Sequence, residues 1–274
     1  MQVADSAASR PPDMGWQPTA PGLARSVLRM TIPVEYRLRL RRSALDTAVV
    51  SEILMTVDGR LRTAHVSRRT QLVIDAPARS GNSYARAAFQ YANGTGVLIA
   101  THGHTHRMMV RGARLHLPTI VLLRDPRDVL ASAMAYEPGV PALLTARAYR
   151  RYYEEVLPLL EHILVAPFER VTSDFGDVIV RCNERFGTPF IPYQATKESE
   201  AAIAESIDGA TKLVVRPEHF DAVVSRPSSG RLRSRALLEK VDHDTQAELD
   251  SCVAVYLEVR RRARLDEWGD GPEG

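Results

Sequence analysis

A small loop rich in serine and glycine follows the first strongly apolar run in the middle of the chain. The run 72–74, Leu-Val-Ile, is too short for a helix and suits a strand buried on both faces. Residues 77–82 supply a break, and the small residues after them favour a helix. Gly81 permits a tight turn, and Ser80 and Ser83 offer hydroxyl groups. Because the first amides of a helix point back into such a loop, the segment is suited to binding an anion.

The loop does not match the signature of nucleoside-triphosphate hydrolases. That signature, G-x-x-x-x-G-K-[S/T], needs a lysine for the outer phosphates and a hydroxyl for magnesium. Here Ala76 replaces the first glycine, Asn82 replaces the lysine, and the nearby cation, Arg79, precedes the glycine. A plain strand-to-helix connection therefore remains an alternative to an anion-binding loop.

A second stretch, residues 118–136, repeats the pattern of apolar strand, charged turn and helix. Arg124 stands at the end of the expected strand, and Ser132 follows eight residues later, on the second turn of the expected helix. In open parallel sheets, ligands bind outside the carboxyl ends of the strands. The two stretches therefore predict one shared anion site.

These two stretches together resemble the sulfotransferase family. The segment 77–84, PARSGNSY, looks like the family's 5′-phosphosulfate loop, and the segment 124–132, RDPRDVLAS, looks like its 3′-phosphate strand and helix. The resemblance implies an α/β fold with three α/β/α layers, a mostly parallel central sheet and a likeness to the P-loop nucleoside-triphosphate hydrolases. It also implies transfer of a sulfuryl group from 3′-phosphoadenosine 5′-phosphosulfate (PAPS) to a hydroxyl or amine of a small-molecule or glycan acceptor. The product nucleotide would be adenosine 3′,5′-bisphosphate, and no metal is expected.

The resemblance also assigns expected roles to individual residues. Arg79 matches the loop lysine of the family and would stabilise the leaving phosphate. A basic loop near the C-terminus, at 230–233, would close the donor site, although its order departs from the family's Arg-Lys-Gly. Phe168 and Glu169 fall where the family often has an aromatic-acid pair near the adenine. The residues expected to bind the donor are Arg79, Ser80, Gly81, Asn82, Ser83, Tyr84, Arg124, Ser132, Arg231 and Arg233.

Three alternating histidines, His102, His104 and His106, follow the expected strand at 97–100. Side chains two apart on a strand face the same way, so a metal site is one interpretation. No Asp, Glu or Cys lies near them in the sequence, which argues against it. The family resemblance offers another role, because Thr101-His102 matches a Thr-His pair whose histidine is the catalytic base. His104 is the second candidate for that base.

Length and composition predict one domain with an N-terminal arm. The chain has 274 residues, of which 45% are apolar, and this is enough for one large core. We expect a flexible arm over residues 1–45 and the sulfotransferase domain over residues 46–274. The formal charge is only +3, so a pI near 9.0 without a basic cluster interleaved with aromatic residues does not indicate nucleic-acid binding.

The arm and the cysteines bear on the expected surroundings of the protein. Residues 23–45 mix apolar residues with arginines, but Pro33 argues against one continuous membrane-surface helix. We expect this arm to pack on the domain or on a partner subunit, which would make a homodimer. We expect Cys182 and Cys252 to be buried thiols and the protein to lie in a reducing compartment. With no apolar stretch long enough to span a membrane and no signal-peptide pattern, a cytoplasmic location is expected.

The remaining pattern predicts further core elements. We expect a strand at 163–165 and helices at 141–161 and 195–208. A helix carrying Cys182 should end at Gly187, and a last helix should run over 245–265.

Two other functions compete with sulfuryl transfer. A nucleotide-dependent phosphotransferase would need magnesium, and the missing loop lysine disfavours it. A non-catalytic nucleotide-binding scaffold is disfavoured by the retained Thr101-His102 pair.

Overall fold

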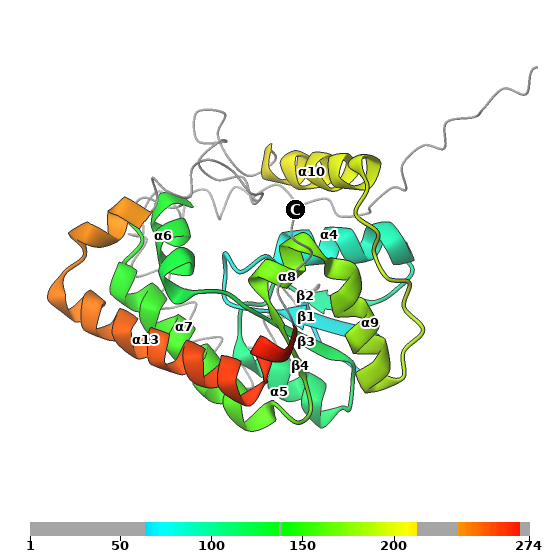
Figure 1. Ribbon diagram of the computed structural model, residues 1–274, viewed down its shortest axis with the longest axis horizontal. Coiled ribbons are helices and arrows are strands. Elements are labelled where there is room, and N and C mark those ends of the chain that lie inside the picture. Colours follow the sequence, from blue (N-terminus) through cyan, green and yellow to red (C-terminus); the bar gives the residue numbers. More distant parts are fainter. Residues whose placement is uncertain (1–63, 137–138, 213–234, 269–274) are drawn as a thin grey trace, which may run out of the picture.

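The computed structural model describes residues 64–136, 139–212 and 235–268. A four-stranded, fully parallel sheet in the order β2-β1-β3-β4 lies at its centre (Figure 1). The strands are β1 (Leu72–Asp75), β2 (Ile99–Thr101), β3 (Thr119–Leu123) and β4 (Leu164–Pro167). The first strand of the sheet therefore lies inside it, with β2 on one side and β3 on the other.

Helices cover both faces of this sheet (Figure 1). One face packs against α4 (Asn82–Asn93), α8 (Phe168–Ser173) and α9 (Phe175–Phe186). The other packs against α5 (His106–Arg114), behind which lies α7 (Ala142–Val156). The three-layer α/β/α fold expected from the sequence is confirmed.

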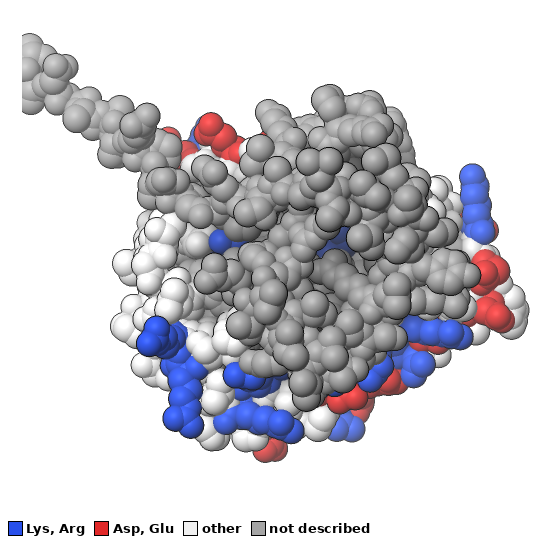
Figure 2. All heavy atoms as spheres, turned by 180° about the vertical axis from the view of Figure 1, so that it is seen from behind, with Lys and Arg blue, Asp and Glu red and all other residues white. Residues whose placement is uncertain are grey.

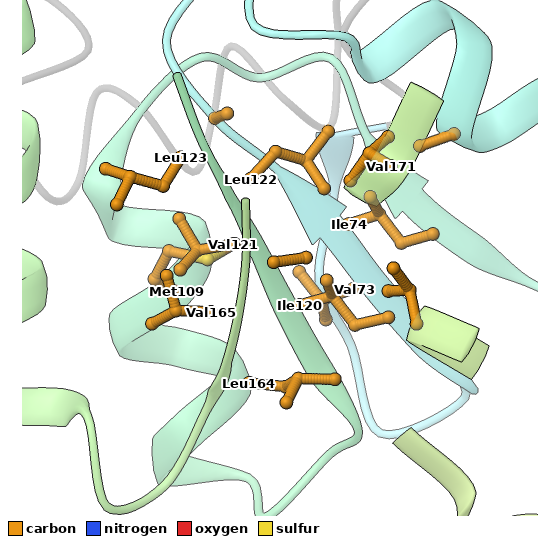
Figure 3. Packing of buried hydrophobic residues seen from close by; sticks show 14 of the residues in the cluster. Val73, Ile74, Met109, Ile120, Val121, Leu122, Leu123, Leu164, Val165 and Val171 are labelled. Carbon is orange, nitrogen blue, oxygen red and sulfur yellow. The ribbon is translucent and has the colours of Figure 1, made fainter. Parts of the chain in front are cut away.

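Buried side chains fill the space between the layers. All residues of β1 and β3 are buried, as expected for strands covered on both faces. Figure 3 shows Met109 of α5 beside Val121 and Val165 on one face of the sheet, and Val171 of α8 near Ile74 on the other. Buried side chains thus pack on both faces of the sheet, and this packing fixes where the ends of the strands lie.

The remaining helices frame the carboxyl end of the sheet and the outer surface. The helix α6 (Pro126–Tyr136) follows β3 and packs against α7, and α10 (Lys197–Lys212) packs on α4. The long helix α13 (His243–Arg262) lies along α7 (Figure 1). Three short 3₁₀ helices complete the described elements: η2 (Leu157–Leu159), η4 (Ala236–Lys240) and η5 (Leu265–Trp268).

Two predicted features of the core helices are confirmed. The helix carrying Cys182 ends where Gly187 adopts a left-handed conformation with φ 66°, which is the helix stop that glycine favours. Cys182 and Cys252 are both buried and unbridged. The Cys252 thiol donates a hydrogen bond to the Ala146 carbonyl at 3.2 Å, so it joins α13 to α7.

Some predicted boundaries differ from the observed ones. The strand expected at 97–100 is β2, which pairs with β1 from Ile99 onward, while Leu98 is exposed. The helix expected over 141–161 ends at Val156, because the chain tightens into η2 around Pro158, which cannot donate a backbone hydrogen bond.

Several sequence predictions fall outside the described residues. They concern the arm at 1–45, the domain boundary at 46, the homodimer through that arm, and Arg231 and Arg233.

Within the described ranges, no helix is both long enough and apolar enough to cross a membrane. On the face shown in Figure 2, described basic and acidic side chains both lie along the lower rim.

Candidate active site

The loop between β1 and α4 has the tight turn that its sequence predicts. Gly81 has a φ of 96°, a left-handed conformation that a side chain would strain. A Cβ atom at this position would also lie 3.2 Å from the ring of Phe168. The Asn82 amide donates to the Ala76 carbonyl at 3.2 Å and so closes the loop on itself. Glycine is therefore required here both by the turn and by the close approach of α8.

The N-terminus of α4 faces this loop with its first amides uncapped. Among the described residues, no side chain caps the helix at Gly81, and its first turn has no acidic residue. The Asn82 Oδ1 atom is buried and has no hydrogen-bond partner in the described part of the chain. An uncapped helix start beside a glycine turn favours negative charge, so the amides at the start of α4 fit a bound phosphate or sulfate group.

Three residues from the two motifs meet next to this loop. Arg79 Nε donates to Ser132 Oγ of α6 at 2.9 Å, and Arg124 Nη1 donates to the Arg79 carbonyl at 2.6 Å. The Arg79 guanidinium also stacks on the ring of Tyr136 at 4.6 Å. Burial lowers the pKa of Arg79, and an anion would offset that loss of hydration. Residues 53 positions apart in the chain thus make one cluster.

Arg124 is held in place from two sides. Its guanidinium lies 4.2 Å from the centre of the Phe168 ring, and its carbonyl accepts a hydrogen bond from the Tyr149 hydroxyl at 2.7 Å. Phe168, which the sequence placed near the adenine, here packs against Arg124 and Gly81. Sequence reasoning missed this supporting contact, because nothing in the spacing of residues shows which helix covers the loop.

Tyr84, another predicted donor-binding residue, has its hydroxyl engaged elsewhere. It donates to Glu200 of α10 at 2.8 Å, and Tyr193 donates to the same Glu200 carboxylate oxygen at 2.9 Å. Burial, followed by the contact with Glu200, raises the pKa of Tyr84. The hydroxyl of Tyr84 thus fastens α10 onto α4, and its predicted role toward the donor stays a prediction.

His102 lies at the end of β2 with hydroxyl groups near both ring nitrogens. Its Nε2 is 3.3 Å from Ser83 Oγ, and its Nδ1 is 3.1 Å from Thr101 Oγ1. Burial lowers the pKa of His102 to about 3, helped by His104 and Arg86. The ring is therefore neutral near pH 7 and has a low affinity for a proton.

His104 has a different set of partners at the same edge of the sheet. Its Nδ1 is 2.9 Å from the Ala76 carbonyl, 3.3 Å from the Asn82 amide nitrogen and 3.9 Å from Asp75 Oδ1. A carbonyl can only accept a hydrogen bond, so the contact with Ala76 favours the tautomer with its proton on Nδ1. In that tautomer the Nε2 atom carries the lone pair.

The metal-site interpretation required the three histidines to lie on a continuous strand, and they do not. His102 and His104 both have left-handed backbone conformations, with φ of 61° and 53°, and His106 is the first residue of α5. The alternating-strand geometry is therefore wrong, because the chain turns immediately after Thr101. Within residues 64–136, 139–212 and 235–268, no group of three or more His, Cys, Asp or Glu side chains could hold a metal ion.

Asp75 is a buried carboxyl group that sequence reasoning did not select. It is the last residue of β1, is fully buried, and accepts a hydrogen bond from the Thr105 amide at 3.2 Å through Oδ2. Burial raises the pKa of Asp75 to about 7, although backbone amides such as that of His104 counteract the rise. An acidic residue directly after an apolar run was the one signal in the sequence that could have identified it.

Of the comparisons with known proteins, only the one with solved structures gave matches. No family model matches the chain, and no curated protein sequence matches it. Among solved structures, the chain is similar to the crystal structure of mouse sulfotransferase SULT7A1 complexed with PAP. The identity is 13%, the TM-score is 0.46, and the match covers 80% of this chain and 93% of that one. A likeness this distant decides nothing about what this chain binds.

The raised pKa of Asp75 predicts a pH-dependent stability. The folded carboxyl group holds its proton up to about pH 7, whereas an unfolded aspartate loses it near about pH 4. Stability of the native chain should therefore fall as pH rises through this window, relative to Asp75→Asn, by up to about 4 kcal/mol. Urea unfolding of both proteins across this range measures the difference. A difference that stays constant with pH would contradict the buried, proton-binding carboxyl group.

Proposed function

We propose that this protein is a sulfotransferase that moves a sulfuryl group from PAPS to a hydroxyl or amine of a small-molecule or glycan acceptor. The proposal rests on the resemblance of residues 77–84 and 124–132 to the family's two donor-binding motifs. It is supported above all by the contact of Arg79 with Ser132, which joins those two motifs at one edge of the sheet.

In this proposal two groups of residues bind the donor nucleotide. The amides at the start of α4, with Ser80 and Ser83, would bind the 5′-phosphosulfate. Arg124 and Ser132 would bind the 3′-phosphate, as the motif resemblance implies. Arg79 lies between these groups and would neutralise charge on the leaving phosphate, because a guanidinium stays protonated and can bind two oxygens at once.

We propose His104, rather than His102, as the base that takes the acceptor's proton. The contact of its Nδ1 with the Ala76 carbonyl directs the lone pair to Nε2, and the Asp75 carboxyl group lies behind the ring. The lowered pKa of His102 makes that ring a weaker base near neutral pH. His102 instead contacts Ser83, which suits a role in ordering the loop.

The donor supplies an activated sulfuryl group whose leaving group is adenosine 3′,5′-bisphosphate. The protein has to align acceptor and donor, remove one proton and stabilise charge on the departing oxygen. As the acceptor oxygen or nitrogen bonds to sulfur, the bond from sulfur to the bridging oxygen breaks. The acceptor's proton would pass to His104 Nε2.

The two competing functions receive less support from the site. A phosphotransferase of the P-loop type needs a cation after the loop glycine, whereas Asn82 occupies that position and uses its amide to close the loop. A non-catalytic scaffold leaves unexplained why a histidine is paired with a buried carboxyl group at the anion site. A cytoplasmic location remains part of the proposal.

The predicted 3′-phosphate contact can be tested by nucleotide binding. Adenosine 3′,5′-bisphosphate should bind at least about tenfold more tightly than adenosine 5′-monophosphate, because it adds charge-assisted hydrogen bonds to Arg124 and Ser132. Ser132→Ala should reduce this preference and leave monophosphate binding nearly unchanged, as measured by titration calorimetry.

Ser251→Ala on the exposed face of α13 provides the matched control, since that hydroxyl bonds only within its own helix among the described residues. Equal affinities of the native protein for the two nucleotides would count against a sulfotransferase. A requirement for magnesium in binding would favour the phosphotransferase instead.

The identity of the base can be tested with asparagine variants, since asparagine tolerates the left-handed conformation at both histidines. His104→Asn should lower turnover by about 10²-fold or more, and His102→Asn should lower it less. Exposed His162, outside the site, supplies the control variant His162→Asn.

The pH dependence of turnover is a second test of whether His104 or His102 is the base. A base coupled to Asp75 predicts that turnover falls as pH drops through about 7, since Asp75 then takes up a proton and loses the negative charge that acts on the His104 ring. If His102, whose pKa is lowered to about 3, were the base, turnover would fall only at a far lower pH. A flat profile together with loss of activity in His102→Asn would move the assignment to His102.

A further inference from the structure

The carboxyl group of Asp75 lies at the carboxyl end of the interior strand β1, where charge is expensive to bury. Asp75 pairs in register with Val121 of β3, and its side chain is fully buried. Removing a carboxylate from water costs several kcal/mol unless nearby groups compensate. An apolar residue would suit this strand position better, so the carboxyl group calls for a reason other than packing.

One role that would account for the buried carboxyl group of Asp75 is to hold the turn that carries His102 and His104. Asp75 Oδ2 accepts the Thr105 amide, and other amides of this turn also stabilise the charged form of the carboxyl group. His102 and His104 have left-handed backbone conformations, which are unfavourable for residues with side chains. Between them lies Gly103, where an added Cβ atom would clash with the Met108 side chain unless that side chain moved. The turn is therefore strained, and Asp75 anchors it.

A second role follows from the remaining carboxylate oxygen. Asp75 Oδ1 lies 3.9 Å from His104 Nδ1 and makes no hydrogen bond within the described part of the chain. The Ala76 carbonyl already accepts the Nδ1 proton, so Oδ1 acts on the ring through its charge. A proton arriving at Nε2 makes the ring positive, and a carboxylate at this distance favours that form.

Other titratable groups around the pair leave this coupling in place. Tyr152 and Tyr153 of α7 lie near Asp75, and burial together with the Asp75 charge raises the pKa of both hydroxyls, which keeps them neutral. The His102 ring lies 5.9 Å from the His104 ring and stays neutral because burial lowers its pKa. Arg86 of α4 adds positive charge on the side of His102.

We propose that Asp75 is a positioning residue for the transfer reaction, one that holds the His102–Thr105 turn and supplies the negative charge against which the His104 ring accepts the acceptor's proton. This inference rests on the proposed sulfotransferase function. Asp75 touches neither donor nor acceptor and acts through His104. The proton leaves the acceptor oxygen or nitrogen, resides on Nε2 as sulfur is transferred, and is released to solvent afterwards.

Two substitutions separate the anchoring role from the charge. Asp75→Asn keeps an oxygen that can accept the Thr105 amide but removes the charge, whereas Asp75→Ala removes both. In Asp75→Asn, turnover should fall by about tenfold or more, while the KM for PAPS and the affinity for adenosine 3′,5′-bisphosphate stay within about twofold. The fall in turnover at low pH should also move to lower pH. Asp75→Ala should lose thermal stability in addition.

A double-mutant cycle tests whether Asp75 acts through His104. Adding Asp75→Asn to His104→Asn should cost no further activity, because the ring on which the charge acts is already gone. Multiplied losses in the double variant would mean that Asp75 serves only the structure, and this would overturn the proposal. Equal turnover of Asp75→Asn and the native protein would overturn it as well.

Nuclear magnetic resonance of the free protein decides the coupling independently of any activity. With ¹⁵N-labelled histidine, the His104 ring should show the tautomer protonated on Nδ1, and Asp75→Asn should move its titration midpoint to lower pH by about 1 unit or more. An unchanged midpoint would overturn the inference. If the native protein neither binds adenosine 3′,5′-bisphosphate nor uses PAPS, the proposed function fails, whereas this titration still reports on the pair.

Discussion

Parallel pairing of β1 with β2 on one side and with β3 on the other is the constraint on which the site depends. The chain leaves β1 for one edge of the sheet and returns across it to β3, so the segments after β1 and β3 lie side by side at the carboxyl edge. This is where open α/β sheets bind ligands. The uncapped start of α4, the Arg79–Ser132 contact and the histidine turn after β2 all follow from this arrangement.

The site also holds polar groups whose burial opposes folding. Arg79, Asp75 and His102 all have pKa values displaced by burial in the direction of the neutral form. Groups of this kind are typical of sites where function, rather than stability, selects the residue. Arg124 is buried as well, but the Phe168 ring and the Arg79 carbonyl compensate it directly.

Much of the fold followed from the sequence, because buried parallel strands are continuous apolar runs and helices end at residues such as Gly187. That the segments after β1 and β3 meet also followed, since the ends of parallel strands share an edge, but the contact of Arg79 with Ser132 itself was not predicted. The contacts between individual side chains could not be predicted from the sequence. The contact of Tyr84 with Glu200 joins residues 116 positions apart, and the packing of Phe168 on Arg124 depends on where α8 lies. Asp75 was missed because a single acidic residue carries no periodic signal, and the histidine turn because alternation looks the same in a strand and in a loop.

The proposed reaction at this site is the transfer of a sulfuryl group from PAPS. The most direct measurement is incubation of the native protein with sulfur-labelled PAPS and a small-molecule extract, followed by mass spectrometry of the products. A labelled sulfate ester or sulfamate that requires the native protein, forms without added metal and is lost with His104→Asn is the predicted result. If no labelled product forms, and the same extract instead gains phosphate from a nucleoside triphosphate with magnesium, the sulfotransferase assignment is contradicted.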